Sequence, residues 1–238
     1  MLTACLIVAL ATATVSATSR PIIGVLSQEV PPQLKLNFTS YIAASYVKAI
    51  EASGARVVPI AIGQTYVYYE NILGKINGVV FPGGGVDFNS PKGYGEAALK
   101  ILDIAMKLND RGDYFPLMGV CLGYEMLMFA ASKDYRILTK CDADSPLSLN
   151  FVTGYNSSRL FSKAPQEIIN ILATLPTTSN HHLNCVTVEN HAKHHLQKSW
   201  RILTTNQDKN GVHFISTSES LHYPFVGLQF HPEKNAYE

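Results

Sequence analysis

Cys121 stands between two glycines, in the run Gly119-Val120-Cys121-Leu122-Gly123. An apolar stretch precedes it and a helical pattern begins at Leu122, so the cysteine lies where a strand passes into a helix. Flanking glycines allow a sharp turn and keep other side chains away from the sulfur. A helix N-terminus lowers the pKa of a thiol, and its N–H groups can bind an oxyanion. This pattern predicts a nucleophile; the alternative is a buried cysteine acting as a small hydrophobic side chain.

A cysteine nucleophile needs a base, and the base needs a group that orients it. His231 follows an apolar stretch near the end of the chain, in Gln229-Phe230-His231-Pro232-Glu233. We therefore predict His231 as the general base and Glu233 as the carboxylate that holds its imidazole ring.

Three glycines, Gly83, Gly84 and Gly85, follow another apolar stretch and precede Val86 and Asp87. Glycines let backbone N–H groups approach a ligand closely. In a parallel sheet this loop would lie at the same edge as Cys121, where open α/β sheets bind ligands. The loop is predicted to supply a second oxyanion donor, with an ordinary tight turn as the alternative. It is not a phosphate loop, because the terminal Gly-Lys-Ser/Thr is missing.

Strands and helices alternate in the first half of the chain, which predicts an α/β fold, a three-layer sandwich around a mainly parallel sheet. The expected strands cover residues 21–27, 56–60, 75–82 and 115–120, and the expected helices cover 40–53, 94–108 and 122–131. The second half is β-rich, with strands expected at 186–188, 201–205, 213–217 and 225–230. No repeat or linker divides residues 18–238, so one domain is expected.

The composition excludes several classes of protein. The 238 residues are 47% hydrophobic with a net charge of +1, which suits a globular protein and argues against a nucleic-acid-binding surface. Only the first residues are continuously apolar, so no internal membrane span is expected. The histidines at 191, 194 and 195 lack the acidic residue of the zinc-protease motif, and we predict a solvated face there and no metal site.

Residues 1–17 combine a short apolar run with small residues ending at Ala17, which predicts a cleaved secretory signal peptide. The alternative, an N-terminal strand, is disfavoured by the Thr- and Ala-rich sequence. Two glycosylation sequons, at Asn37 and Asn156, agree with secretion. Cys141 and Cys185 either pair with each other or remain buried thiols, and the sequence leaves both open.

The order of these motifs resembles the class I glutamine amidotransferase-like superfamily and, within it, the gamma-glutamyl hydrolase family. The segments that carry the resemblance are PIIGVL at 21–26, FPGGGVD at 81–87, DYFP at 113–116, CLGYE at 121–125, LTTN at 203–206 and HPEKNAYE at 231–238. The resemblance implies the amidotransferase-like fold and cleavage of folylpoly-γ-glutamates and antifolate polyglutamates in the lysosome or outside the cell. It also implies a homodimer that needs no cofactor.

For the site, the resemblance implies Cys121 as nucleophile, His231 as acid and base, and Glu233 as its partner. It places Leu122 with Gly84 or Gly85 at the oxyanion, and Glu125 and His182 near the substrate. Amidotransferases typically have glutamine where Glu125 stands. The family continues past His-Pro-Glu-Lys with further helical sequence, so we expect this chain to lack that C-terminal segment. Two alternatives are an inactive secreted binder of γ-glutamyl compounds or folate, and a glutaminase-type amidotransferase.

Overall fold

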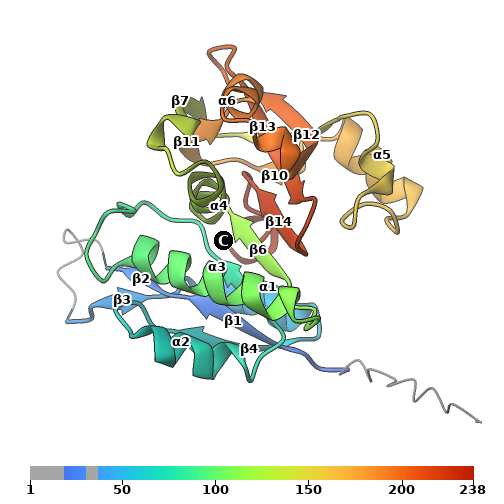
Figure 1. Cartoon of the computed structure of the whole chain (residues 1–238). Coiled ribbons are helices and arrows are strands. Elements are labelled where there is room, and N and C mark those ends of the chain that lie inside the picture. The colour runs from blue at the N-terminus through green and yellow to red at the C-terminus, as the bar shows by residue number, and fades with distance from the viewer. Residues whose placement is uncertain (1–18, 31–36) are drawn as a thin grey trace, which may run out of the picture.

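An eight-stranded sheet forms the centre of the computed structural model, which describes residues 19–30 and 37–238 (Figure 1). The predicted signal peptide lies outside the described residues. Five neighbouring strands are parallel, in the order β4 (Arg56–Ile60), β1 (Ile22–Leu26), β5 (Gly78–Phe81), β6 (Leu117–Val120) and β14 (Phe225–Leu228). Three antiparallel strands extend the sheet, in the order β13 (His213–Ser220), β12 (Trp200–Gln207) and β9 (Asn150–Phe151).

Helices cover both faces of the parallel strands. Successive side chains of a strand point to opposite faces of the sheet, so neighbouring residues pack against different helices. Val79 and Phe81 of β5 pack into the larger core, with side chains from α2 (Tyr66–Leu73), α3 (Tyr94–Asp110) and α4 (Leu122–Ser132). Val80, between them in sequence, packs into the smaller core with Tyr46 of α1 (Ala44–Ala52). This arrangement confirms the predicted three-layer sandwich with a mainly parallel sheet.

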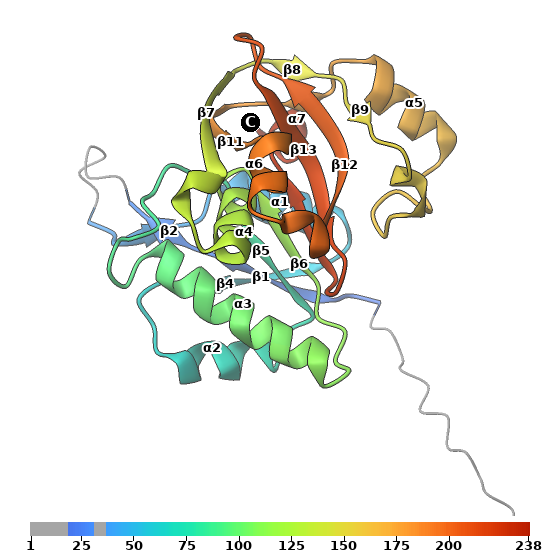
Figure 2. The same ribbon diagram turned by 45° about the horizontal axis from the view of Figure 1, so that its top comes forward.

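The second half of the chain adds smaller elements around the antiparallel strands (Figure 2). Two two-stranded sheets pair β7 (Leu138–Ala143) with β11 (His182–Val186) and β8 (Pro146–Leu147) with β10 (Thr178–Ser179). A further two-stranded sheet, in the first half of the chain, pairs β2 (Gln28–Glu29) with β3 (Ser40–Tyr41). The remaining helices are α5 (Gln166–Thr174), α6 (Val188–Lys193), α7 (Lys234–Tyr237) and the 3₁₀ turns Tyr135–Ile137, Tyr155–Ser157 and Leu196–Lys198.

Two of the expected boundaries differ from the structure for local reasons that it shows. The strand expected at 186–188 ends at Val186, because the Thr187 hydroxyl accepts a hydrogen bond from the Asn190 N–H at 3.1 Å and caps α6. The helix expected from residue 40 begins only at Ala44, because β3 pairs with β2. Among the described residues, no helix is long and apolar enough to cross a membrane.

Candidate active site

Cys121 occupies the junction between β6 and α4 in a backbone conformation that L-residues rarely adopt, with φ of 50° and ψ of −110°. The two flanking glycines make this turn possible. A Cβ on Gly123 would lie 2.1 Å from the carbonyl oxygen of Phe81, and one on Gly119 would lie 2.5 Å from the carbonyl oxygen of Gly123. Strain of this kind at one buried residue is typical of a strand–nucleophile–helix turn.

His231 and Glu233 lie next to this turn because β14 pairs in parallel with β6, with Leu228 opposite Val120. The Nδ1 atom of His231 is 2.7 Å from Oε1 of Glu233, and both side chains are buried. Because Glu233 engages Nδ1, Nε2 is the ring nitrogen that remains for Cys121.

Gly83 lies between the imidazole ring and the cysteine. A Cβ placed on Gly83 would lie 2.5 Å from Cε1 of His231 and 3.0 Å from Cβ of Cys121, so the two side chains border the same gap. The Gly83 N–H donates to the Tyr46 hydroxyl at 2.7 Å, and that hydroxyl is 3.3 Å from Nδ1 of His231. No sequence pattern indicates this role of Tyr46, which lies on an ordinary amphipathic helix.

Gly83→Ala is expected to lower kcat/KM by about a hundredfold, because the new methyl group pushes the imidazole away from Cys121, and a displacement of about 1 Å can cost that much. Gly74→Ala is the matched control, since Gly74 ends α2 with φ of −65° and lies outside the site. Steady-state kinetics of both variants, with circular dichroism to check folding, measure the difference. Equal activity in the two variants would show that the position of the His231 imidazole ring does not depend on the absence of a side chain at Gly83.

The electrostatics of Cys121 differ from the sequence-based expectation. Burial raises the pKa of the Cys121 thiol well above its usual value, and the Glu125 carboxylate raises it further. A hydrogen bond from the Leu122 N–H lowers the pKa but does not offset burial. The first N–H of the helix therefore lowers the pKa of the thiol, as predicted, but burial raises it by more. Burial therefore favours the neutral thiol, and attack by the sulfur requires a base that removes its proton.

Glu125 and His182 are both buried beside Cys121, and burial favours the uncharged form of each. Burial raises the pKa of Glu125 to about 7, although Nε2 of Gln229 donates to its Oε1 at 3.0 Å. Burial lowers the pKa of His182 to about 4, although its Nδ1 lies 3.0 Å from the Asn184 carbonyl oxygen. Gln229 is a second site residue whose role no sequence pattern indicates.

These two groups make opposite contributions to stability between pH 4.5 and 6.5. Folded Glu125 keeps a proton that the unfolded chain releases above pH 4.5, so its stabilisation is lost as pH rises towards 7. His182 stays unprotonated in the folded chain, whereas the same histidine in the unfolded chain takes up a proton below pH 6.5. Its contribution to the stability of the fold is therefore lost as pH falls towards 4. Each effect amounts to about 3 kcal/mol by the usual conversion of a pKa shift.

We therefore expect Glu125→Gln to make the free energy of unfolding rise with pH in this window, and His182→Asn to make it fall. Urea unfolding at several pH values measures both slopes. Parallel slopes in the two variants and the wild type would contradict the assignment.

A cavity of about 500 Å³ opens in front of the cysteine. Its walls are residues 84–87, Cys121 with Leu122, Glu125, residues 142–144 and residues 181–184. All five of the residues predicted around the substrate or oxyanion, Gly84, Gly85, Leu122, Glu125 and His182, therefore line one cavity with Cys121. Leu122 is the first residue of α4, so its N–H has no acceptor within the helix.

A larger cavity of about 790 Å³ lies on the α1 side of the sheet. Its lining is mostly apolar, with side chains such as Ile23, Met118 and Val226. Cys121 does not line it, so the size of a cavity does not locate the chemistry here.

The other histidines are dispersed. His181 pairs with Asp144 at 2.6 Å on the surface, and its carbonyl oxygen lies 4.0 Å from Sγ of Cys121. The solvated face expected for the histidine cluster is wrong for His191, which is buried in α6. Within residues 19–30 and 37–238, no group of three or more His, Cys, Asp or Glu side chains could hold a metal ion.

Comparison with known proteins identifies the family of this chain. The family model of peptidase C26 matches residues 21–233. The chain belongs to the peptidase C26 family. Two similar proteins are the gamma-glutamyl hydrolases of Homo sapiens, 40% identical over 221 residues, and Mus musculus, 42% identical over 223 residues. These matches cover 92% and 93% of this chain, and 69% of each relative.

A solved structure supports the fold of this peptidase C26 chain. A Thermoplasma acidophilum protein assigned as a component of GMP synthase aligns with a TM-score of 0.58 at 12% identity, covering 91% of this chain and 86% of the other. At that identity the likeness shows the fold alone, and it confirms the class I glutamine amidotransferase-like architecture.

Proposed function

We propose that this chain hydrolyses the γ-glutamyl amide bonds of folylpoly-γ-glutamates and antifolate polyglutamates. The observation that carries the proposal is the position of the buried His231–Glu233 pair beside Cys121, which itself lines the cavity of about 500 Å³. The 40% identity to human gamma-glutamyl hydrolase supports the choice of bond and substrate.

In the proposed reaction, Nε2 of His231 takes the Cys121 proton as the sulfur attacks the γ-carbonyl carbon. The N–H groups of Leu122 and of Gly84 or Gly85 stabilise the oxyanion. His231 then gives its proton to the leaving amine as the C–N bond breaks, and a thioester remains on Cys121. Water, deprotonated by His231, then attacks the thioester carbonyl, the C–S bond breaks to release the carboxylate product, and His231 returns its proton to the sulfur. These steps use only the side chains and amides of the site, with no metal or organic cofactor.

The experiment that tests this function incubates the purified chain with a folate pentaglutamate at acidic and neutral pH, and resolves the products by mass spectrometry. We expect loss of glutamates, blocked by prior treatment with iodoacetamide. Binding without cleavage by a folded sample would select an inactive binder instead. Release of ammonia from glutamine, without cleavage of the pentaglutamate, would select a glutaminase-type amidotransferase.

We further propose that the chain enters the secretory pathway and acts in the lysosome and outside the cell. Asn37 and Asn156, the two predicted glycosylation sites, are both accessible at least in part, which supports their use. We expect a glycosidase that removes N-linked glycans to increase gel mobility after expression in a eukaryotic secretory host. The Asn37→Gln/Asn156→Gln variant should show no such shift; a shift in that variant would place the glycans elsewhere.

Residues 18–238 are proposed to act as one domain and to assemble as a homodimer, as the family resemblance implies. Light scattering coupled to size-exclusion chromatography would measure the mass in solution. A mass of one chain across the accessible concentration range would rule out a stable dimer.

A further inference from the structure

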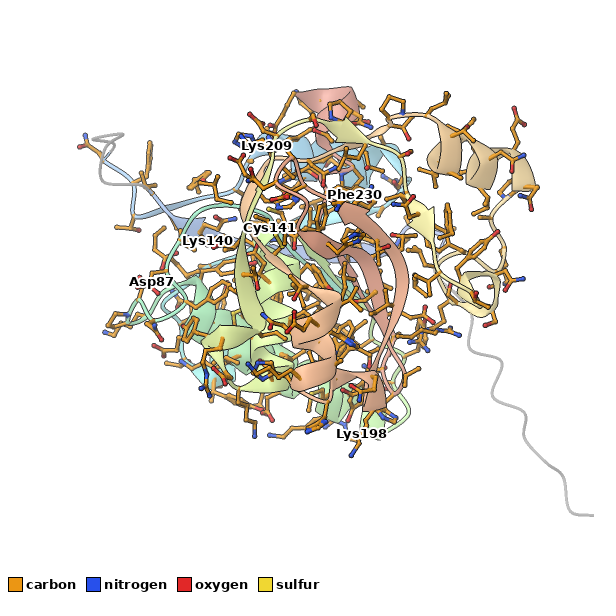
Figure 3. The ribbon with its side chains drawn as sticks, turned by 90° about the horizontal axis from the view of Figure 1, so that it is seen from above. Asp87, Lys140, Cys141, Lys198, Lys209 and Phe230 are labelled. Atoms are coloured by element: carbon orange, nitrogen blue, oxygen red, sulfur yellow. A yellow bond between two sulfur atoms is a disulfide. The ribbon has the colours of Figure 1, made fainter. Side chains whose placement is uncertain are left out.

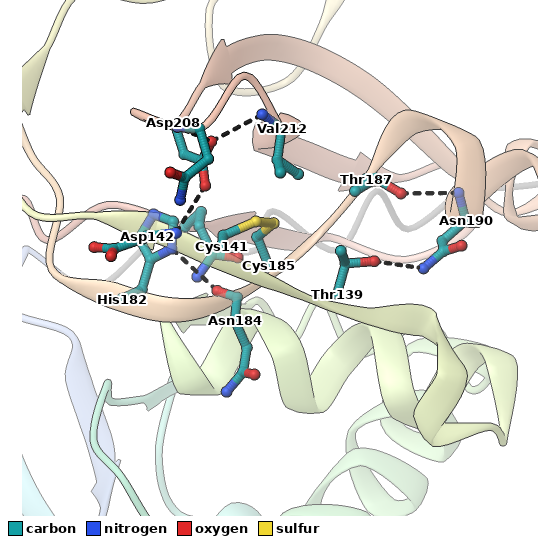
Figure 4. Close-up of a disulfide and its surroundings, with 12 residues drawn as sticks. Thr139, Cys141, Asp142, His182, Asn184, Cys185, Thr187, Asn190, Asp208 and Val212 are labelled. Atoms are coloured by element: carbon teal, nitrogen blue, oxygen red, sulfur yellow. Dashed lines mark hydrogen bonds between the residues drawn. A yellow bond between two sulfur atoms is a disulfide. The ribbon is translucent and has the colours of Figure 1, made fainter.

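A disulfide joins Cys141 of β7 to Cys185 of β11 (Figure 4). Of the two alternatives that the sequence left open, a pair or two buried thiols, the structure therefore shows the pair. Both cysteines are buried, and their Cα atoms are 5.8 Å apart. The two strands form a sheet of their own, outside the eight-stranded sheet. Because an isolated pair of strands is only marginally stable, its geometry depends on contacts beyond the ladder of hydrogen bonds.

The ladder between these strands is interrupted at the disulfide. Asn184 pairs with Lys140, but His182, two positions away on β11, pairs with Ala143, three positions away on β7. One extra residue therefore sits in the stretch of β7 that contains Cys141. A bulge of this kind leaves backbone groups unpaired and bends the strand. The disulfide joins Cys141, inside this stretch, to Cys185, which lies just beyond it and pairs regularly with Thr139.

The two ends of the pair are held in different ways. Away from the cavity, the Asn190 side chain donates to Oγ1 of Thr139 at 2.9 Å and to the carbonyl oxygens of Arg136 and Ile137. On the cavity side, the Asp142 N–H donates to Oδ2 of Asp208 at 2.8 Å. The bulge separates these two ends, and the disulfide connects them.

The cavity side of the pair forms one wall of the candidate active site, whose lining also includes Gly84 and Gly85. Residues 142–144 and 181–184 line the cavity with Cys121, and the His181 carbonyl oxygen touches the Cys121 sulfur at 4.0 Å. Figure 3, which looks down on the molecule, labels Cys141 beside Lys140. The two bridged cysteines are sequence neighbours of Asp142 and Asn184, which line the cavity. A shift in the backbone at either cysteine therefore also shifts a residue that lines the cavity.

We propose that the Cys141–Cys185 disulfide is a positioning cross-link that holds the β7–β11 wall against Cys121, so that its reduction loosens the wall and weakens substrate binding. Only the identity of the substrate rests on the proposed function. In the reduction, a dithiol supplies two electrons and two protons, the S–S bond breaks to give two thiols, and the dithiol becomes its own disulfide. Cys121 takes no part in this exchange.

The test compares the wild-type chain with the Cys141→Ala/Cys185→Ala variant by two measurements. The first is the rate at which iodoacetamide alkylates Cys121, followed by mass spectrometry of the peptide that carries it. The second is kcat and KM for folate pentaglutamate. We expect alkylation to accelerate severalfold, and kcat/KM to fall by about ten- to a hundredfold, mainly through KM. Should the variant fail to fold, the wild-type chain reduced with dithiothreitol replaces it in both measurements.

Asn190→Ala is the matched control, because it removes the contacts at the other end of the same two strands. It should leave the alkylation rate unchanged. An equal acceleration in this control would show that the disulfide only stabilises the fold in general, and it would overturn the proposal. Unchanged alkylation and unchanged KM in the double variant would overturn it as well. Faster alkylation in a chain that never cleaves the pentaglutamate would disprove the proposed function and leave the positioning role standing.

Discussion

Cys121→Ala is expected to abolish cleavage of folate pentaglutamate, with kcat lower by about a millionfold, as follows the loss of a nucleophile in acyl transfer. The cause is specific: the sulfur is the atom that forms the thioester, and within residues 19–30 and 37–238 the other two cysteines are bonded to each other. No described thiol can therefore replace it. Stopped assays with mass spectrometry, run at high enzyme concentration, measure the residual rate.

Binding should survive this substitution, because alanine removes one atom from a cavity with many other lining residues. Calorimetry with the intact pentaglutamate would measure a dissociation constant within severalfold of the wild-type KM. Cys121→Ser is the matched variant: it keeps an atom at the same place, yet its hydroxyl is a far weaker nucleophile at neutral pH. Turnover near the wild-type rate in either variant would remove Cys121 from the chemistry.

The sequence predicts the central sheet well because each of its parallel strands is a short apolar run followed by a change in pattern. It also places the functional loops correctly, since the carboxyl ends of parallel strands share one edge. The glycine loop after β5, Cys121 after β6 and His231 after β14 meet there for that reason alone. The helices α2, α5, α6 and α7 have no counterpart among the expected helices.

The features that the sequence could not show depend on packing between distant segments. Tyr46 reaches Gly83 and His231 only through the fold, across 37 and 185 positions of the chain. The high pKa of the Cys121 thiol follows from burial, whereas the sequence pattern shows only the helix that follows it. The disulfide joins two strands whose cysteines lie 44 positions apart, and no local pattern around Cys141 indicates this pairing or the bulge in β7.

Glu233→Gln is expected to lower kcat by about ten thousandfold, the effect of replacing the carboxylate by an amide in an analogous triad. Oε1 of Glu233 accepts from Nδ1 of His231 at 2.7 Å, which keeps the proton on Nδ1 and leaves Nε2 free to accept the Cys121 proton. An amide group that donates to Nδ1 would move the ring proton to Nε2, the wrong nitrogen for a base. It would also remove the negative charge that stabilises the imidazolium formed during attack.

Three measurements separate this role from a structural one. KM should change little, because the Glu233 side chain lies behind the imidazole ring and does not line the cavity that opens at Cys121. Alkylation of Cys121 by iodoacetamide should slow together with kcat, since both depend on the same base removing the thiol proton. Glu238→Gln is the matched control at the end of the same short segment, where Oε1 of Glu238 accepts from Oγ of Ser45 at 2.6 Å, and it should retain wild-type rates. If Glu233→Gln alkylates as fast as the wild type while losing turnover, His231 acts without Glu233 in the first step, and the carboxylate is needed only later, when the leaving amine takes its proton.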